Sequence, residues 1–161
     1  MSSAFSPSLD NVIRFRGDIH AEVVCPGAAC PLHGGIARAG VVEIRDVRNA
    51  VQNEGKNQLT TLSGKTGLTG REGFAWTVIA SDSATPEGGP VGPKHTQSNT
   101  FAFNSTGVYQ ASSSHTGIAA SISSAWLYNT VSDLFLCAGT FSQIVLSTAD
   151  TLNIVYTVSF T

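Results

Sequence analysis

The sequence predicts a mainly β fold: an antiparallel β-sandwich or jelly-roll-like domain with one short α-helix at about residues 50–63. Three observations favour this fold class. Segments of strand length recur between turn signals in the second half of the chain, the final segment alternates apolar and polar residues, and helical spacing with capping residues occurs once. With 161 residues, the chain is expected to form a single domain, residues 1–161, that is long enough to bury a core.

Two strands separated by an irregular loop are expected in the N-terminal part. Residues 11–24 are rich in β-branched and aromatic side chains, with a bend at Gly17, and predict the first strand. Residues 25–40 contain Pro and Gly too often for regular structure, so we expect a loop there. Residues 41–47 form the second predicted strand.

The predicted helix lies between two boundary signals. Asn49 is suited to be its N-cap, Gln52 follows three residues later, and Gly64 is suited to end the helix in the left-handed conformation. The residues between them place a narrow apolar stripe at near-helical spacing, which would let the helix lie across a sheet. Gly55 lies within this stripe and costs about 1 kcal/mol relative to Ala, which favours a short helix or a close backbone contact.

The rest of the chain is predicted to form strands, with one long irregular arm between them. Residues 74–81 predict a third strand, and residues 83–98, with three Pro and three Gly, predict an extended arm. Each of the remaining segments has strand length and ends at turn signals, and together they predict four more strands: residues 100–110, 117–128, 134–141 and 151–160.

The composition excludes several classes of partner. Charged residues make up only 12% of the chain, whereas 19 Ser and 16 Thr supply hydroxyl groups, so neutral polar side chains do most of the solvation. Nine dispersed Lys and Arg cannot form a nucleic-acid-binding surface, and no apolar run reaches the length of a membrane helix. The N-terminus does not resemble a signal peptide, which predicts synthesis in the cytoplasm.

The charges are unevenly distributed along the chain. All nine cations lie at or before Lys94, and the last 67 residues contain only Asp133 and Asp150 as formal charges. Two explanations stay open: this region is covered by neighbouring subunits, or Ser, Thr and Asn are sufficient to solvate an exposed sheet.

The densest group of metal-ligating residue types consists of His20, Cys25, Cys30 and His33. Two thiols and two imidazoles within 14 residues could close a tetrahedral zinc site, although their spacing departs from the common zinc motifs. A Cys25–Cys30 disulfide is a second interpretation, and small buried thiols with surface histidines are the third. Cys137, in an apolar strand, is expected in the core.

No set of residues predicts catalysis, so we expect a non-enzymatic protein without a cofactor. Ser114 and His115 lie in a Ser-rich predicted turn without a nearby orienting acid. Asp133 and Asp150 are expected to bond the local backbone at turns. The sequence Arg16-Gly17-Asp18 spells an integrin-binding tripeptide by a three-residue match, and Ser63-Gly64-Lys65-Thr66 lacks the preceding Gly of a phosphate loop. Trp76 and Trp126 are expected to pack in the core.

Two regions of the chain carry a resemblance to a known class of protein. Residues 41–64, VVEIRDVRNAVQNEGKNQLTTLSG, followed by FAWTVIASDSATP at 74–86, resemble the strand–helix–strand opening of small tailed-bacteriophage virion structural proteins. The end of the chain, residues 122–161 with Trp126-Leu127-Tyr128-Asn129 and Asp150-Thr151-Leu152, resembles their closing hairpins. About half of the chain is covered, and the first 40 residues and the arm at 83–98 have no counterpart.

The resemblance implies a virion component. The expected function is capsid decoration or cementing, or the base of a head fibre, in a homo-oligomer for which a trimer is one arrangement. The partners would be the major capsid protein or other virion proteins, and the location would be the virion, assembled in the host cytoplasm. The alternative is a tail fibre, adaptor or receptor-binding module that recognises carbohydrate through exposed aromatic residues: Trp76, Tyr109, Trp126 and Tyr128.

Overall fold

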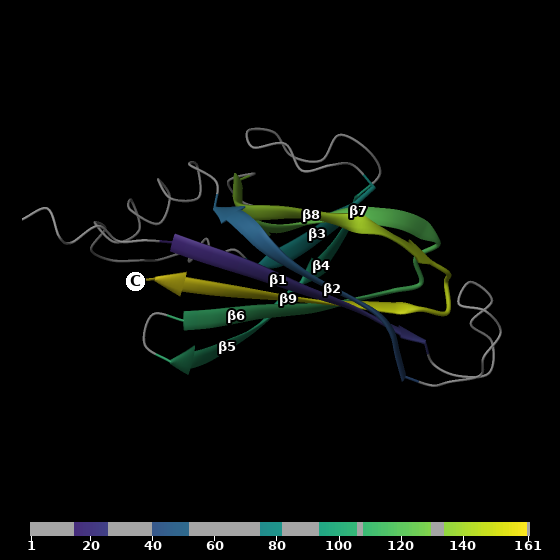
Figure 1. The fold of residues 1–161 in the computed structure, drawn as a ribbon, viewed down its shortest axis with the longest axis horizontal. Helices are drawn as coiled ribbons and strands as arrows, with labels where there is room; N and C mark the ends of the chain where they lie inside the picture. The colour runs from purple at the N-terminus through teal and green to yellow at the C-terminus, as the bar shows by residue number, and fades with distance from the viewer. Residues whose placement is uncertain are drawn as a thin grey trace, which may run out of the picture.

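In the computed structural model the chain forms antiparallel β-sheets (Figure 1). The structure describes residues 15–25, 40–51, 75–81, 94–105, 108–129 and 134–160. None of these residues is helical, and none of them contributes to a helix that could span a membrane. The strands are β1 (Phe15–Cys25), β2 (Gly40–Val51), β3 (Trp76–Ala80), β4 (Lys94–Ser98), β5 (Thr100–Ser105), β6 (Val108–Thr116), β7 (Ala120–Asn129), β8 (Leu134–Leu146) and β9 (Thr151–Phe160).

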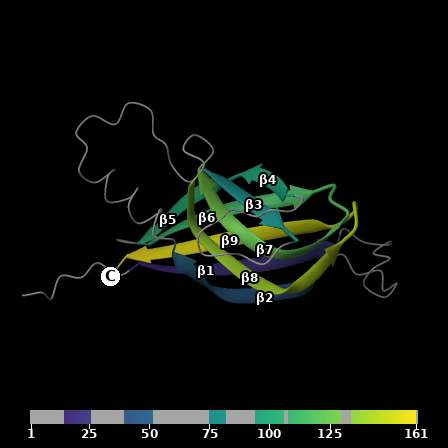
Figure 2. The same ribbon diagram turned by 90° about the horizontal axis from the view of Figure 1, so that it is seen from above.

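The strands form two sheets that share β2. The continuous order is β4-β3-β7-β8-β2-β1-β9-β6-β5, and every neighbouring pair is antiparallel. Sheet A is β2-β1-β9-β6-β5, and sheet B is β4-β3-β7-β8 with the last two residues of β2. Figure 1 shows β2 crossing from the layer of β1 and β9 to the layer of β8, and Figure 2 shows the same arrangement from above.

The hydrophobic core lies between the facing sides of the two sheets. Sheet A contributes Ile19 and Val23 from β1 and an alternating row from β9, and sheet B contributes residues such as Ile79 and Leu127. Each fully buried side chain of this size stabilises the fold by about 1.5–3 kcal/mol. In β9 the buried residues are Leu152, Ile154, Tyr156 and Val158.

Close approach of the sheets depends on a glycine in β8. A Cβ at Gly139 would overlap Cδ1 of Ile19, and it would also approach Val47. Ile19 is only 2% exposed and has little room to move. Gly139 therefore sets how closely β8 lies over β1.

Several sequence-based boundaries are corrected by the structure. The strand β2 continues through Val51, so no helix begins at residue 50, and residues 52–63 lie outside the described part. The predicted arm at 83–98 ends in strand β4 over its last five residues, because these polar residues pair along the edge of the buried strand β3. Residues 83–93 also lie outside the described part.

Other boundaries are confirmed or shifted. The predicted strand at 151–160 coincides with β9. The predicted strand at 100–110 is two strands, β5 and the start of β6. The predicted strand at 117–128 begins only at Ala120, because Gly117 has a left-handed φ of 71° and turns the chain between β6 and β7. The predicted loop at 25–40 is flanked by Cys25 in β1 and Gly40 in β2, and its interior is outside the described residues.

Candidate functional site

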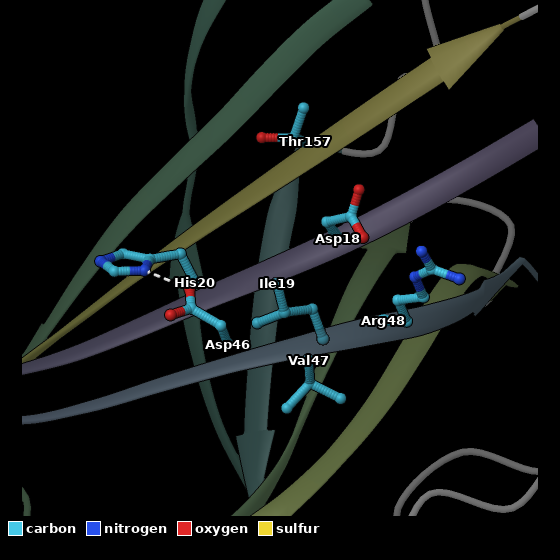
Figure 3. A pocket seen from close by; sticks show the side chains of 7 residues that line it. All are labelled: Asp18, Ile19, His20, Asp46, Val47, Arg48 and Thr157. Carbon is cyan, nitrogen blue, oxygen red and sulfur yellow. Dashed lines mark hydrogen bonds and ion pairs between the residues drawn. The ribbon is translucent and has the colours of Figure 1, made fainter.

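Ionisable side chains gather on the outward face of sheet A, on β1 and β2. Strand alternation buries Ile19, Ala21 and Val23 and leaves the even-numbered residues of β1 on the opposite face. The register places Asp46 of β2 beside His20 and Arg48 beside Asp18. A hollow of about 380 Å³ lies here, lined by Asp18, Ile19, His20, Asp46, Val47, Arg48 and Thr157 (Figure 3).

His20 is the centre of this cluster. Its Nδ1 lies 2.6 Å from Oδ1 of Asp46, and its Nε2 lies 3.6 Å from a carboxylate oxygen of Glu22. The hydrogen bond with Asp46 is the largest cause that raises the pKa of His20 above its ordinary value of 6.5, against the smaller opposing effect of burial. The two carboxylates therefore favour the protonated form of the imidazole, and Figure 3 shows its bond to Asp46.

The geometry around His20 differs from that of a metal site or a nucleophilic dyad. Its two ring nitrogens point to different carboxylates, so Asp46 and Glu22 cannot join the imidazole on one ion. Among the residues that the structure describes, no group of three His, Cys, Asp or Glu is arranged to hold a metal. On β9 the residue opposite His20 is Val155, which offers no hydroxyl.

Arg16 and Asp18, the ends of the tripeptide Arg16-Gly17-Asp18, bind each other. Nε of Arg16 lies 2.8 Å from Oδ2 of Asp18, and the second nitrogen donates to Oδ1 at 3.2 Å. The two side chains lie on one face of β1, because they are two residues apart in a strand. The charges that the tripeptide would present to a receptor are thus engaged with each other.

On β9 and β6, the next two strands of sheet A, all outward-facing residues are described. None of them is charged. Gln110 donates a hydrogen bond to Thr157 at 3.1 Å, and Ser114 donates one to Asn153 at 2.7 Å, so neutral groups bridge the two strands. We call this surface the neutral face: Val108, Gln110, Ser112, Ser114 and Thr116 of β6, with Thr151, Asn153, Val155, Thr157 and Ser159 of β9.

The two zinc candidates that the structure describes, His20 and Cys25, lie far apart. His20 lies on the outward face of β1, whereas Cys25 is buried on the inward face. Five residues of extended strand separate them by roughly 16 Å, too far to share one ion. Cys30 and His33 lie outside the described residues, so a Cys25–Cys30 disulfide stays a prediction, as does the location of the Cys137 side chain.

The aromatic candidates divide between the core and the surface. Trp126 is 1% exposed, which confirms its predicted burial and removes it as a stacking surface. Trp76 and Tyr128 are only partly buried, and they lie directly opposite each other on β3 and β7. Tyr109 is also partly buried and packs against the main core.

The histidine that the sequence placed in a turn is part of strand β6. His115 is 2% exposed on the inward face, and its Nε2 lies 3.2 Å from the hydroxyl of Ser113. Burial lowers the pKa of His115 to about 4, with a smaller contribution from the charge of His95. Ala111, Ser113 and His115 alternate along the strand and are all buried, and this spacing was the one sign of a strand here. The three consecutive Ser residues instead favoured the prediction of a turn.

The predicted role of Asp150 is confirmed. Its carboxylate accepts hydrogen bonds from the backbone N–H of Ser147 at 2.7 Å and from the Ser147 hydroxyl at 2.8 Å. These bonds close the turn between β8 and β9. Asp133 lies outside the described residues.

Comparisons of the chain with family models, with curated proteins and with solved structures found no match.

Proposed function

We propose that this chain is a non-enzymatic structural subunit of a tailed-phage particle, with a β-sandwich fold. It would act as a capsid decoration or cement protein, or as the base of a head fibre, through contacts with copies of itself and with other virion proteins. The observation that carries the proposal is the neutral face of β6 and β9.

The physical support comes from the cost of covering this face. Burying an ionised group in an interface costs several kcal/mol unless it is well paired, whereas neutral hydroxyl and amide groups cost less once they are hydrogen-bonded. Contacts made by packing and neutral hydrogen bonds also change little with salt. Among the described residues, the ion pairs of the outward face lie on β1 and β2, so the neutral face is the part of sheet A that a neighbour can cover at least cost.

The heat resistance of particles assembled with and without the chain tests this proposal. Particles that lack the chain should lose resistance to heat, and adding purified chain should restore it. Ser114→Arg, which places a charge on the neutral face, should prevent restoration, whereas Thr140→Arg at an exposed position of β8 should restore it fully. Equal restoration by both variants would remove the neutral face from the proposal.

A second candidate function is supported by Trp76 and Tyr128. Their direct pairing across β3 and β7 leaves two partly exposed rings side by side, an arrangement on which a sugar ring can stack. The chain would then be a tail fibre, adaptor or receptor-binding module.

Glycan binding by the purified chain tests the alternative. Trp76→Ala should weaken binding, while Phe101→Ala, at an exposed aromatic residue on β5, should not. Particles that lack the chain would keep their stability to heat but fail to adsorb to the host. Adsorption by such particles would exclude the tail function.

A further inference from the structure

Three strand edges lie at the margins of the described sheets, and they differ in how they are protected. β4 and β5 are the two end strands of the continuous order, and β2 pairs with β8 only through Ala50 and Val51. An exposed edge is a template for another strand, and proteins usually block it with charges, Pro or local side-chain bonds. The type of protection therefore indicates which edge accepts a partner.

Charged residues protect two of these edges. β4 begins with exposed Lys94. On β2, Arg45 donates a hydrogen bond to the backbone carbonyl of Ile44 at 2.8 Å and to Ser142 of β8 at 2.7 Å, and it also binds Glu43. Arg45 thus places a charged side chain between β2 and β8, where it is already engaged in hydrogen bonds.

β5 lacks this protection. Its sequence, Thr-Phe-Ala-Phe-Asn-Ser, contains no charged residue and no Pro. Phe101 is 42% exposed, and Thr100 and Ala102 are also exposed. Figure 1 and Figure 2 both show β5 at the outer end of sheet A, next to β6.

We infer that β5 pairs with β5 of a second copy of this chain, in antiparallel orientation, and joins the two A sheets into one. A second copy is the occupant that the charges favour, because a charged edge placed against β5 would leave its charge desolvated without a partner. Of the two end strands in the described part of the chain, only β5 has no charged residue. The strand edge that best complements it is therefore β5 of another copy. The biological meaning of this contact rests on the proposed function as an assembly subunit.

The two-fold symmetry restricts the register. Residues opposite each other in an antiparallel pair share a face, so one residue must lie opposite its own copy, with the two-fold axis midway between the two. The ladder of β5 with β6 is irregular between Phe103 and Ser105, which favours a centre on Ala102. Ala102 then lies opposite its own copy, with Cβ atoms about 5 Å apart.

Cysteine cross-linking of the purified full-length chain tests the register. Under mild oxidation, Ala102→Cys should form an intermolecular disulfide. Thr96→Cys, at the exposed centre of β4, is the matched control and should give only the background of the native cysteines that the wild-type chain also gives. Equal cross-linking of the two variants, or none at Ala102→Cys, would overturn the inference.

Charge substitution tests the contact without a cysteine. By sedimentation, Ala102→Lys should weaken self-association by about tenfold or more, and Thr96→Lys should leave it unchanged. Self-association that Ala102→Lys does not weaken, or a chain that stays monomeric at every concentration, would also overturn the inference. If Ala102→Cys fails to cross-link but the chain still restores heat resistance to particles, only this inference fails. If restoration also fails, the proposed function fails with it.

Discussion

Acid should destabilise this fold through His115. The imidazole is 2% exposed, and burial lowers its pKa from the ordinary 6.5 to about 4, so the folded state disfavours its charged form. In the unfolded chain the same group binds a proton near pH 6.5. Above that pH both states are neutral at this site and it does not affect stability.

The magnitude follows from the two pKa values. As the pH falls from 6.5 to about 4, His115 binds a proton in the unfolded state but stays neutral in the folded state. The free energy of unfolding therefore decreases. The loss amounts to about 2 kcal/mol at pH 5 and about 3 kcal/mol below pH 4, where it becomes constant. This is a substantial part of the total stability of a domain of this size.

Urea unfolding of the wild-type chain and of His115→Gln, across this pH range, measures the effect. Subtracting the two curves removes the contribution of the carboxylates, and the difference should change by about 3 kcal/mol between pH 7 and pH 4. The outward-facing His20→Gln is the control, because the pKa of His20 is raised and its contribution has the opposite sign. A difference curve for His115→Gln that is flat with pH would refute the assignment of a buried neutral imidazole.

Three further predictions concern single positions. His20→Gln should remove a stabilising contribution that is present below pH 6.5 and lost as the pH rises through the raised pKa of His20, as the difference between variant and wild-type urea curves would show. Gly139→Ala should cost about 1–3 kcal/mol in thermal or urea unfolding through its overlap with Ile19, and adding Ile19→Val should recover part of the loss if the overlap is the cause. Asp150→Ala should cost about 1–2 kcal/mol by the same measurement, because it removes both bonds to Ser147, whereas no loss would show that the turn does not depend on them.

Local patterns in the sequence predict the parts of the fold that are buried on one face. The alternation in residues 151–160 predicts β9 because each second side chain enters the core. The strand β4 was missed because it pairs through its backbone and carries polar residues such as Lys94 and Gln97, which give no hydrophobic period. The bonds of Asp46 and Glu22 with His20 depend on cross-strand register and strand alternation, which spacing along the chain does not reveal.

The candidate interaction surface was predictable only in outline. The lack of cations after Lys94 indicates a neutral C-terminal region, but the sequence does not show that β6 and β9 lie side by side. Their adjacency comes from a long-range pairing, which joins residues 35 to 51 positions apart. The pairing of β5 with β6 places the uncharged edge of β5 next to this face.

Density for the chain on intact particles tests the proposed function most directly. A reconstruction of particles that contain the chain should place the neutral face of β6 and β9 against a neighbouring subunit, with the ion pairs of β1 and β2 turned to solvent. A neutral face that is open to solvent, with the charged strands at the contact instead, would contradict the proposal.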